Sequence, residues 1–282
     1  MDKRAAVAKA LSEEATMPAA PMVMARIAEI CRNPAASARD LGKAIQLDPA
    51  MTSRVLRQVN SSFYGLAATI KTVTHAVVIL GFQEIKHIAL SVPVANLYQE
   101  NLGRAGIDIA ALWERTVAVA CLARRFSYHI RHEVPEQVFV SAILADMGMV
   151  ILNRILGDEY RLLVEGVDDE ELAGKEQIEL GISHVEIGMR LATKWRFPSD
   201  LVEAIALHHK PVTASGLHRE AALTYASRRA IAGLAEGFCF ADILAALPQT
   251  IGAFLAMSAE DMAALWEKSC RDLEEAKAAL AR

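Results

Sequence analysis

The chain has 282 residues, a formal net charge of −4 and 53% hydrophobic residues. This composition excludes a globally disordered chain and leaves room for one large domain or two ordinary ones. The acidic balance gives no electrostatic reason to expect nucleic acid as the main partner. No uncharged apolar run reaches the roughly 18 residues that a membrane span needs, so we expect no membrane insertion.

The cysteines lie far apart and form no CxxC pair, which argues against a structural zinc site or a redox motif. The chain begins with no recognisable signal peptide, so the sequence predicts a cytoplasmic protein. In that compartment cysteines remain reduced, and we expect core thiols at all four positions. These positions are Cys31, Cys121, Cys239 and Cys270.

Apolar residues recur at spacings of three and four along nearly the whole chain, and alternating stretches are scarce, so the pattern predicts an all-α fold. Ser37 and Asp40 form a capping box that opens a short helix. Asp48 followed by Pro49 predicts the start of a second helix. That helix should end near NSSFYG at 60–65, which is rich in turn formers. Its expected buried residues are Met51, Val55 and Val59.

The stretch TVTHAVVILGFQEIKHIAL (72–90) predicts two short helices hinged at Gly81. This spacing also allows a helix-turn-helix, so DNA binding has to be considered. The second helix offers only Lys86 as a fixed positive charge, whereas phosphate neutralisation needs several. We therefore favour helix packing over DNA binding.

NLGRAGID (101–108) contains two glycines and interrupts the helical periodicity. We place a boundary there, between a helical subdomain at 1–104 and a second helical unit at 105–282. Next come a predicted amphipathic helix from Trp113 to His129 and a buried helix at 138–152.

Further along, DDEE (168–171) is expected to be a solvated acidic loop. Ser183 should cap a helix that ends at WRFP (195–198), because a residue before proline disfavours helix. A helix at 199–209 then stops at Lys210-Pro211. The charged pairs Arg124-Arg125 and Arg228-Arg229 are expected on solvated helix faces.

Ser258 and Asp261 form another capping box, which opens the last helix. Its apolar stripe can pack back on the domain or against a second copy in a homodimer, and we favour packing back. The stripe comprises Met262, Leu265, Trp266, Ser269, Leu273, Ala276 and Leu280.

The candidates for cation binding are Asp146, His184, His208 and His209, a donor set that suits zinc, iron or manganese. Adjacent helical residues point about 100° apart, so the last two can share an ion only if the helix unwinds there. The alternative is that these groups hydrogen-bond to one another or cap helices. The sequence contains no G-x-S-x-G motif and no P-loop.

Three stretches together resemble the HDOD domain family. They are LDPAMTSRVLRQVNSSFYG (47–65), TIKTVTHAVVILGFQEIKHIAL (69–90) and HVEIGMRLATKWRFPSDLVEAIALHHKP (184–211). The resemblance covers about 17–230. It implies an HD-domain-like all-α fold with an N-terminal helical subdomain, related to the HD phosphohydrolases and HD-GYP phosphodiesterases, and a role in bacterial signalling.

The resemblance also implies a degenerate hydrolytic site. Active relatives bind metals through histidines and an HD dipeptide, and the metals activate water for attack on phosphate esters. Here Arg115 and Ala145 replace two histidines, and Ser227 lies nearest the position of the closing aspartate. Asp146 and the three histidines remain. We therefore expect neither catalysis nor bound metal, with Asp146 neutralised by Arg115 or a histidine.

Three functions follow from these expectations. The favoured one is a non-catalytic signalling module that contacts a separate signalling protein. The second is a metal-dependent phosphohydrolase that uses Asp146, His184, His208 and His209 with iron, manganese or zinc. The third is a nucleotide sensor in which Arg115 binds phosphate.

Overall fold

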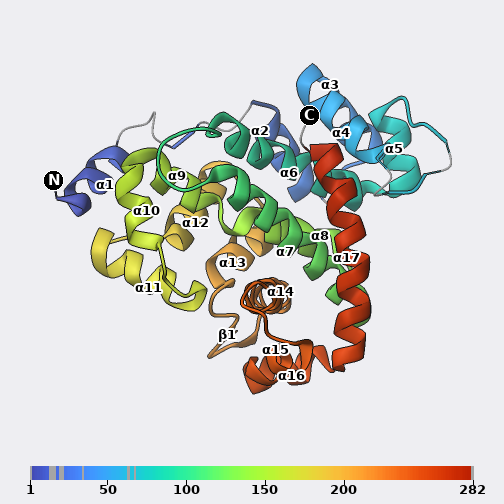
Figure 1. Ribbon diagram of the computed structural model, residues 1–282. Helices are drawn as coiled ribbons and strands as arrows, with labels where there is room; N and C mark the ends of the chain where they lie inside the picture. Colours follow the sequence, from blue (N-terminus) through green and yellow to red (C-terminus); the bar gives the residue numbers. More distant parts are fainter. Residues whose placement is uncertain are drawn as a thin grey trace.

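The computed structural model describes residues 2–12, 17–18, 22–33, 35–61, 64–66 and 68–280, without the side chains of 22, 31, 32 and 277–280. Helices build nearly all of it (Figure 1), which confirms the all-α prediction. The first helices are α1 (Lys3–Ser12), α2 (Met22–Arg32), α3 (Ala38–Gln46), α4 (Pro49–Val59), α5 (Val73–Leu80) and α6 (Phe82–Glu100).

The remaining elements follow a loop at 101–108. The helices up to the hairpin are α7 (Ile109–His129), α8 (Pro135–Ala145), α9 (Met147–Leu156), α10 (Asp158–Val164), α11 (Asp169–Leu180), α12 (His184–Lys194) and α13 (Ser199–Leu207). The antiparallel hairpin β1 (Val212–Thr213) and β2 (Gly216–Leu217) leads to α14 (Arg219–Ala235), α15 (Phe240–Ala246), α16 (Gln249–Leu255) and α17 (Ala259–Leu280).

Helix starts follow the capping signals of the sequence. Ser37 and Asp40 make the predicted reciprocal capping box, and Asp48 caps α4 with Pro49 in its first turn. Ser183 accepts the Glu186 backbone N–H at the start of α12. These predictions are confirmed, because each cap satisfies backbone N–H groups that have no partner inside the helix.

α7 lies at the centre of the molecule, with α8, α14 and α17 packed against it (Figure 1). It starts at Ile109, four residues before the predicted Trp113, because Asp108 accepts the first backbone N–H groups. α6 runs on to Glu100 instead of ending as a short helix. The hinge at Gly81 is confirmed by a φ of 92°, which glycine adopts without strain.

The apolar stretch predicted as one buried helix at 138–152 is two helices. α8 ends at Ala145, and Asp146 (φ −96°, ψ 8°) separates it from α9. By length and composition Pro135–Leu156 could cross a membrane, yet 89% of its most apolar window is buried inside the protein. The pair is therefore the core of this fold, and the break places a carboxylate in the middle of it.

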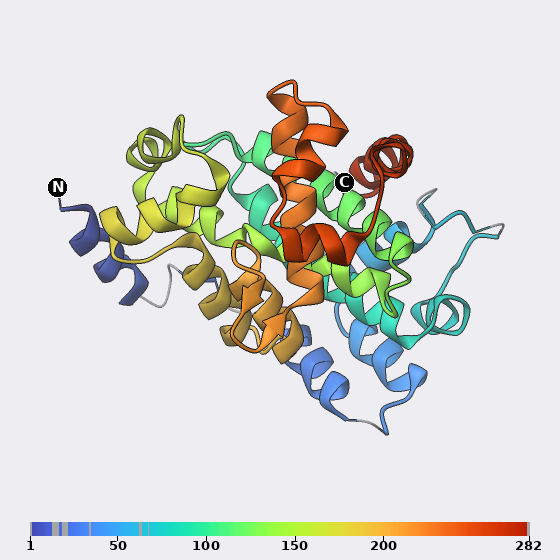
Figure 2. The ribbon, with the colours of Figure 1, turned by 90° about the horizontal axis from the view of Figure 1, so that it is seen from below.

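α17 packs back along α7 and also contacts α4, as expected. The capping box of Ser258 and Asp261 is present, and Arg125 makes two hydrogen bonds of 2.6 and 2.5 Å to Asp272. Met262, Ser269 and Ala276 are buried, whereas Leu265, Trp266 and Leu273 are partly buried; the side chain of Leu280 lies outside the described residues. In Figures 1 and 2, α1 and α17 lie at opposite ends of the molecule.

The cysteine prediction is only partly correct. Cys121 is buried in α7, but Cys239 is exposed at the start of α15 and Cys270 is half-buried on α17. The side chain of Cys31 lies outside the described residues. Core burial therefore holds for one of the three described thiols.

Candidate functional site

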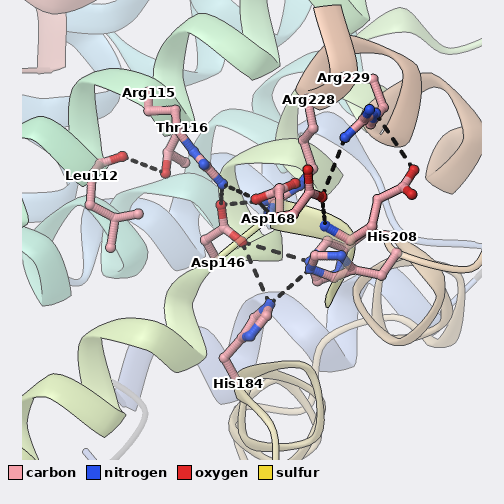
Figure 3. A network of polar contacts seen from close by, with 12 residues as sticks. Leu112, Arg115, Thr116, Asp146, Asp168, His184, His208, Arg228 and Arg229 are labelled. Atoms are coloured by element: carbon pink, nitrogen blue, oxygen red, sulfur yellow. Dashed lines mark hydrogen bonds and ion pairs between the residues drawn. The ribbon is translucent and has the colours of Figure 1, made fainter. Parts of the chain in front are cut away.

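Asp146, His184, His208 and His209 come together in the core. One donor atom of each lies within 4.8 Å of the others, and only His209 is not fully buried. They come from the α8–α9 junction, the start of α12 and the residues after α13. Figure 3 shows Asp146 between His184 and His208 on one side and two arginines on the other.

Glycines allow the close approach of α9 to α12. A Cβ on Gly148 would lie 1.9 Å from the carbonyl oxygen of His184, whereas a Cβ on Gly188 would lie 3.2 Å from the side chain of Ile205 on α13 and 3.7 Å from the backbone of Gly148. α13 ends at Leu207, one residue before the pair, although His208 keeps helical dihedrals (φ −64°, ψ −20°). The rings of His208 and His209 are 4.3 Å apart, so both face the same region from the turn that follows the helix.

Hydrogen bonds at the Nδ1 atoms of two rings indicate which ring nitrogen carries a proton. His184 Nδ1 lies 2.6 Å from the Glu176 carboxylate, and His208 Nδ1 lies 2.6 Å from the Ile205 carbonyl oxygen. Both partners are acceptors, so each Nδ1 carries a proton, and in the neutral form of the imidazole this leaves a lone pair on Nε2. Burial lowers the pKa of His208, which keeps its ring neutral.

The free lone pairs converge on Asp146. Its Oδ1 lies 3.9 Å from His184 Nε2 and 3.7 Å from His208 Nε2. Within the described part of the chain, neither Asp146 Oδ1 nor His208 Nε2 has a hydrogen-bond partner. His209 Nε2 lies 3.1 Å from His184 Nε2. Tetrahedral ligands of zinc lie roughly 3.3 Å apart, whereas these four donor atoms are spread over up to 4.8 Å, so three imidazoles and one carboxylate oxygen could hold a single cation once they draw closer together.

Arginines occupy the opposite side of Asp146. Arg228 Nη1 lies 2.5 Å from Asp146 Oδ2, and its other nitrogens lie 2.9 and 2.6 Å from Asp169. Arg115 lies 2.7 Å from Asp169 and 3.6 Å from Asp146. Burial by itself raises the pKa of both carboxyls, but Arg228 and Arg115, joined at Asp146 by His208, together outweigh it and hold the pKa of each below its usual range.

Two expectations for charged segments are wrong. Arg228 was expected on a solvated face, but only 2% of its side chain is exposed. The acidic stretch is no solvated loop, because Asp168 caps α11 and Asp169 binds both Arg228 and Arg115. Arg229, Arg124 and Arg125 also make ion pairs, with Asp168, Glu136 and Asp272 respectively. Charge alone does not say which helix face an arginine occupies.

The remaining predicted positions contribute no ligand. Ala145 is buried at the end of α8, and the buried hydroxyl of Ser227 donates to the Leu223 carbonyl oxygen. The next residue, Arg228, is the one that reaches the site, not Ser227. Arg115 is a neighbour of Asp146 as expected, but it is farther away than Arg228.

Glu176 and Asp169 belong to the site but were not predicted from the sequence. Glu176 precedes His184 by eight residues and lies on another helix, beyond the turn at Gly181. The only sequence signal is one carboxylate among several on α11, which does not distinguish it from its exposed neighbours.

A family model described as the HDOD domain matches residues 17–211. A curated relative, an uncharacterized protein from Treponema pallidum (strain Nichols), is 24% identical over 203 residues. The match covers 68% of this chain and 37% of that protein, so the chain spans little more than a third of the relative's length.

Solved structures resemble the chain over nearly its whole length. An HDOD domain protein with unknown function from Geobacter sulfurreducens has a TM-score of 0.73 and 21% identity, and the match covers 98% of this chain and 96% of that chain. A protein from Shewanella amazonensis SB2B, provisionally described as a phosphohydrolase, has a TM-score of 0.72 and 23% identity, and the match covers 98% of each chain.

A protein from Marinobacter aquaeolei VT8, provisionally described as a signal transduction protein, gives a TM-score of 0.73 at 19% identity. That match covers 99% of this chain and 66% of the other. At these identities the likeness shows the fold, which is HD-like. Since the family model matches more than half of its residues, the chain belongs to the HDOD domain family.

Proposed function

We propose that this chain is a signal-transduction module that acts by binding a partner and not by hydrolysing phosphate esters. The observation that carries this proposal is the position of Arg228 between Asp146 and Asp169. A guanidinium offers donors only, so it cannot ligate a metal. It also repels a cation 4 Å away by about 4 kcal/mol per unit charge at an effective dielectric of 20.

The charges of the site support the same conclusion. Asp146 and Asp169 carry two negative charges, and Arg228 and Arg115 carry two positive ones, so the four groups cancel. Two-metal hydrolysis depends on cations that neutralise the attacking and leaving oxygens. Here fixed arginines already neutralise Asp146 and Asp169, so neither of these two carboxylates offers uncompensated charge to a second ion.

The other half of the site still fits one cation. His184, His208 and His209 would hold it together with Asp146 Oδ1, a donor set that suits zinc, iron or manganese. When bound, such an ion supplies Lewis acidity. In this proposal the ion is a ligand that stabilises the signalling state of the module, and the partner is a separate protein in the cytoplasm.

The test combines metal analysis with phosphoesterase assays of the purified protein. We expect at most one equivalent of a divalent metal, and no turnover of generic phosphodiesters or cyclic dinucleotides with Mn²⁺ or Fe²⁺. Two equivalents of metal, or turnover above a metal-free blank, would contradict the proposal.

A second function, a metal-dependent phosphohydrolase that uses one ion, is favoured by one observation. The lone pairs of His184 and His208 converge on an unpartnered oxygen of Asp146, as ligands around a Lewis acid do. Turnover that is lost in H184A and kept in H218A, whose histidine caps α14, would establish this function instead.

A further inference from the structure

Glu176 is a completely buried carboxylate on α11 whose hydrogen bonds are directed at one candidate ligand. It accepts the backbone N–H of His184 at 2.7 Å and the ring Nδ1–H of the same residue at 2.6 Å. Tyr160 on α10 donates its hydroxyl to the other oxygen at 2.5 Å. Burial, followed by the charge of Glu176, raises the pKa of Tyr160 well above its usual value, so the hydroxyl stays protonated.

These contacts fix both the rotation and the tautomer of the His184 ring. One oxygen of Glu176 binds the backbone and the ring together, so the ring cannot turn without breaking a charge-assisted bond. At the start of α12, Ser183 caps the N–H of Glu186, and Glu176 accepts the N–H of His184 in addition to the ring. His208, in contrast, takes its acceptor from the backbone of Ile205.

We propose that Glu176, held in place by Tyr160, is the positioning residue that turns His184 Nε2 toward a divalent cation at Asp146. This inference rests on the proposed capacity of the site for one ion. Carboxylates that accept the second N–H of a metal-binding histidine increase its basicity, and their removal typically weakens metal affinity by about 10–100-fold.

The variant E176Q tests the proposal with Zn²⁺ as the probe. Glutamine keeps the size of the side chain but loses its charge, so its amide can also donate and no longer selects one tautomer of His184. We expect Zn²⁺ affinity, measured by competition with a chelator, to fall by about 10–100-fold. Y160F, which removes only the support of Glu176, should cause a smaller loss.

The matched control is E186Q. Glu186 is in the first turn of α12, two residues from His184, and its partly exposed carboxylate pairs with Arg190. The affinity of the E186Q variant for Zn²⁺ should equal that of the wild type. A folded E176Q with wild-type affinity would overturn the proposal. If E176Q does not fold, E176D keeps the charge but withdraws the carboxylate from His184 Nδ1 by one methylene, and unchanged affinity in that variant would overturn the proposal equally.

Imidazole ¹⁵N NMR of the metal-free protein separates this inference from the proposed function. We expect the His184 proton on Nδ1 in the wild type and spread over both nitrogens in E176Q. If the wild type binds no Zn²⁺ but E176Q still redistributes the His184 proton, the proposed metal binding is wrong, whereas the role of Glu176 in positioning the ring stands. A His184 proton on Nε2 in the wild type would overturn the role of Glu176.

Discussion

At the scale of single residues, the two oxygens of Asp146 face different environments. Oδ1 faces the lone pairs of His184 and His208, whereas Oδ2 binds Arg228. A buried ion pair adds little net stability relative to apolar residues, but removing one partner leaves an uncompensated charge. Arg228 therefore determines whether the carboxylate is tolerated in this core without a metal.

The variant R228M should lower the free energy of unfolding by about 3–5 kcal/mol, because Asp146 and Asp169 lose their shared buried partner. Urea denaturation measures this change. Zn²⁺ should then stabilise R228M more than the wild type, because a cation that binds only the folded state raises its stability and the nearer of the two guanidiniums no longer opposes it.

The neighbouring R229M is the control. Arg229 pairs with Asp168 at 3.5 Å near the surface, and its loss should cost less than about 1 kcal/mol. An R228M variant that is no less stable than R229M would show that Arg228 does not neutralise the buried carboxylates.

The residues of the site were predictable to different degrees. Asp146 and the three histidines stand out because polar groups are unusual beside apolar helical patterns. Arg228 and Asp169 do not stand out in the sequence. Arg228 lies 82 positions from Asp146 and Asp169 lies 23 positions from it, and both occur in charged runs that are typical of solvated faces. Only the packing of α14 on α7 and α8, and of α11 on α12, brings them to it.

At the scale of helices, the local capping signals predicted helix starts correctly, whereas the breaks that depend on long-range packing were not predicted. Caps at Ser37, Asp48 and Ser183 define helix starts because they act within three residues. The break at Asp146 has no such signal, since the surrounding run is apolar on every side. It accompanies the close packing at Gly148, which depends on α12 and so on a distant part of the chain.

A second buried polar cluster joins α6, α7 and α8. Arg124 Nε lies 2.6 Å from Glu136, and the Tyr64 hydroxyl donates to Glu136 over 3.5 Å. Glu84 completes the cluster and interacts with both Glu136 and Tyr64, and Asp272 adds a more distant negative charge. Burial, followed by the charge of Glu136, raises the pKa of Glu84 to about 8.

This raised pKa makes stability depend on pH. Between pH 4.5, the ordinary value, and pH 8, folded Glu84 keeps a proton that the unfolded chain has released. The free energy of unfolding should therefore fall as pH rises through that window, by up to about 1.4 kcal/mol per pH unit, and level off above it. E84Q should remove this slope in urea titrations at several pH values.

The partly exposed carboxylate of Glu186 provides the control, because E186Q should keep the wild-type slope. Equal slopes in E84Q and the wild type would mean that Glu84 is ionised in the folded protein at neutral pH.

At the scale of the whole molecule, a continuous hydrophobic core crosses the predicted boundary between 1–104 and 105–282. α6 packs on α8 and α9, and α17 reaches back to α4. The loop at 101–108 is thus a break in the helices, whereas the division into two subdomains remains a prediction. Interfaces this extensive favour unfolding of the two parts together.

Fluorescence and circular dichroism can test this cooperativity, because all three tryptophans, Trp113, Trp195 and Trp266, lie in 105–282. Fluorescence therefore reports on the second part and on its contacts with the first, because Trp113 packs on Tyr98 and Trp195 donates to the Pro18 carbonyl oxygen. The far-ultraviolet helical signal follows the whole chain. We expect the two urea transitions to coincide, because unfolding 1–104 alone would expose the apolar faces of α8 and α17. Transitions that do not coincide would show that the two parts unfold separately.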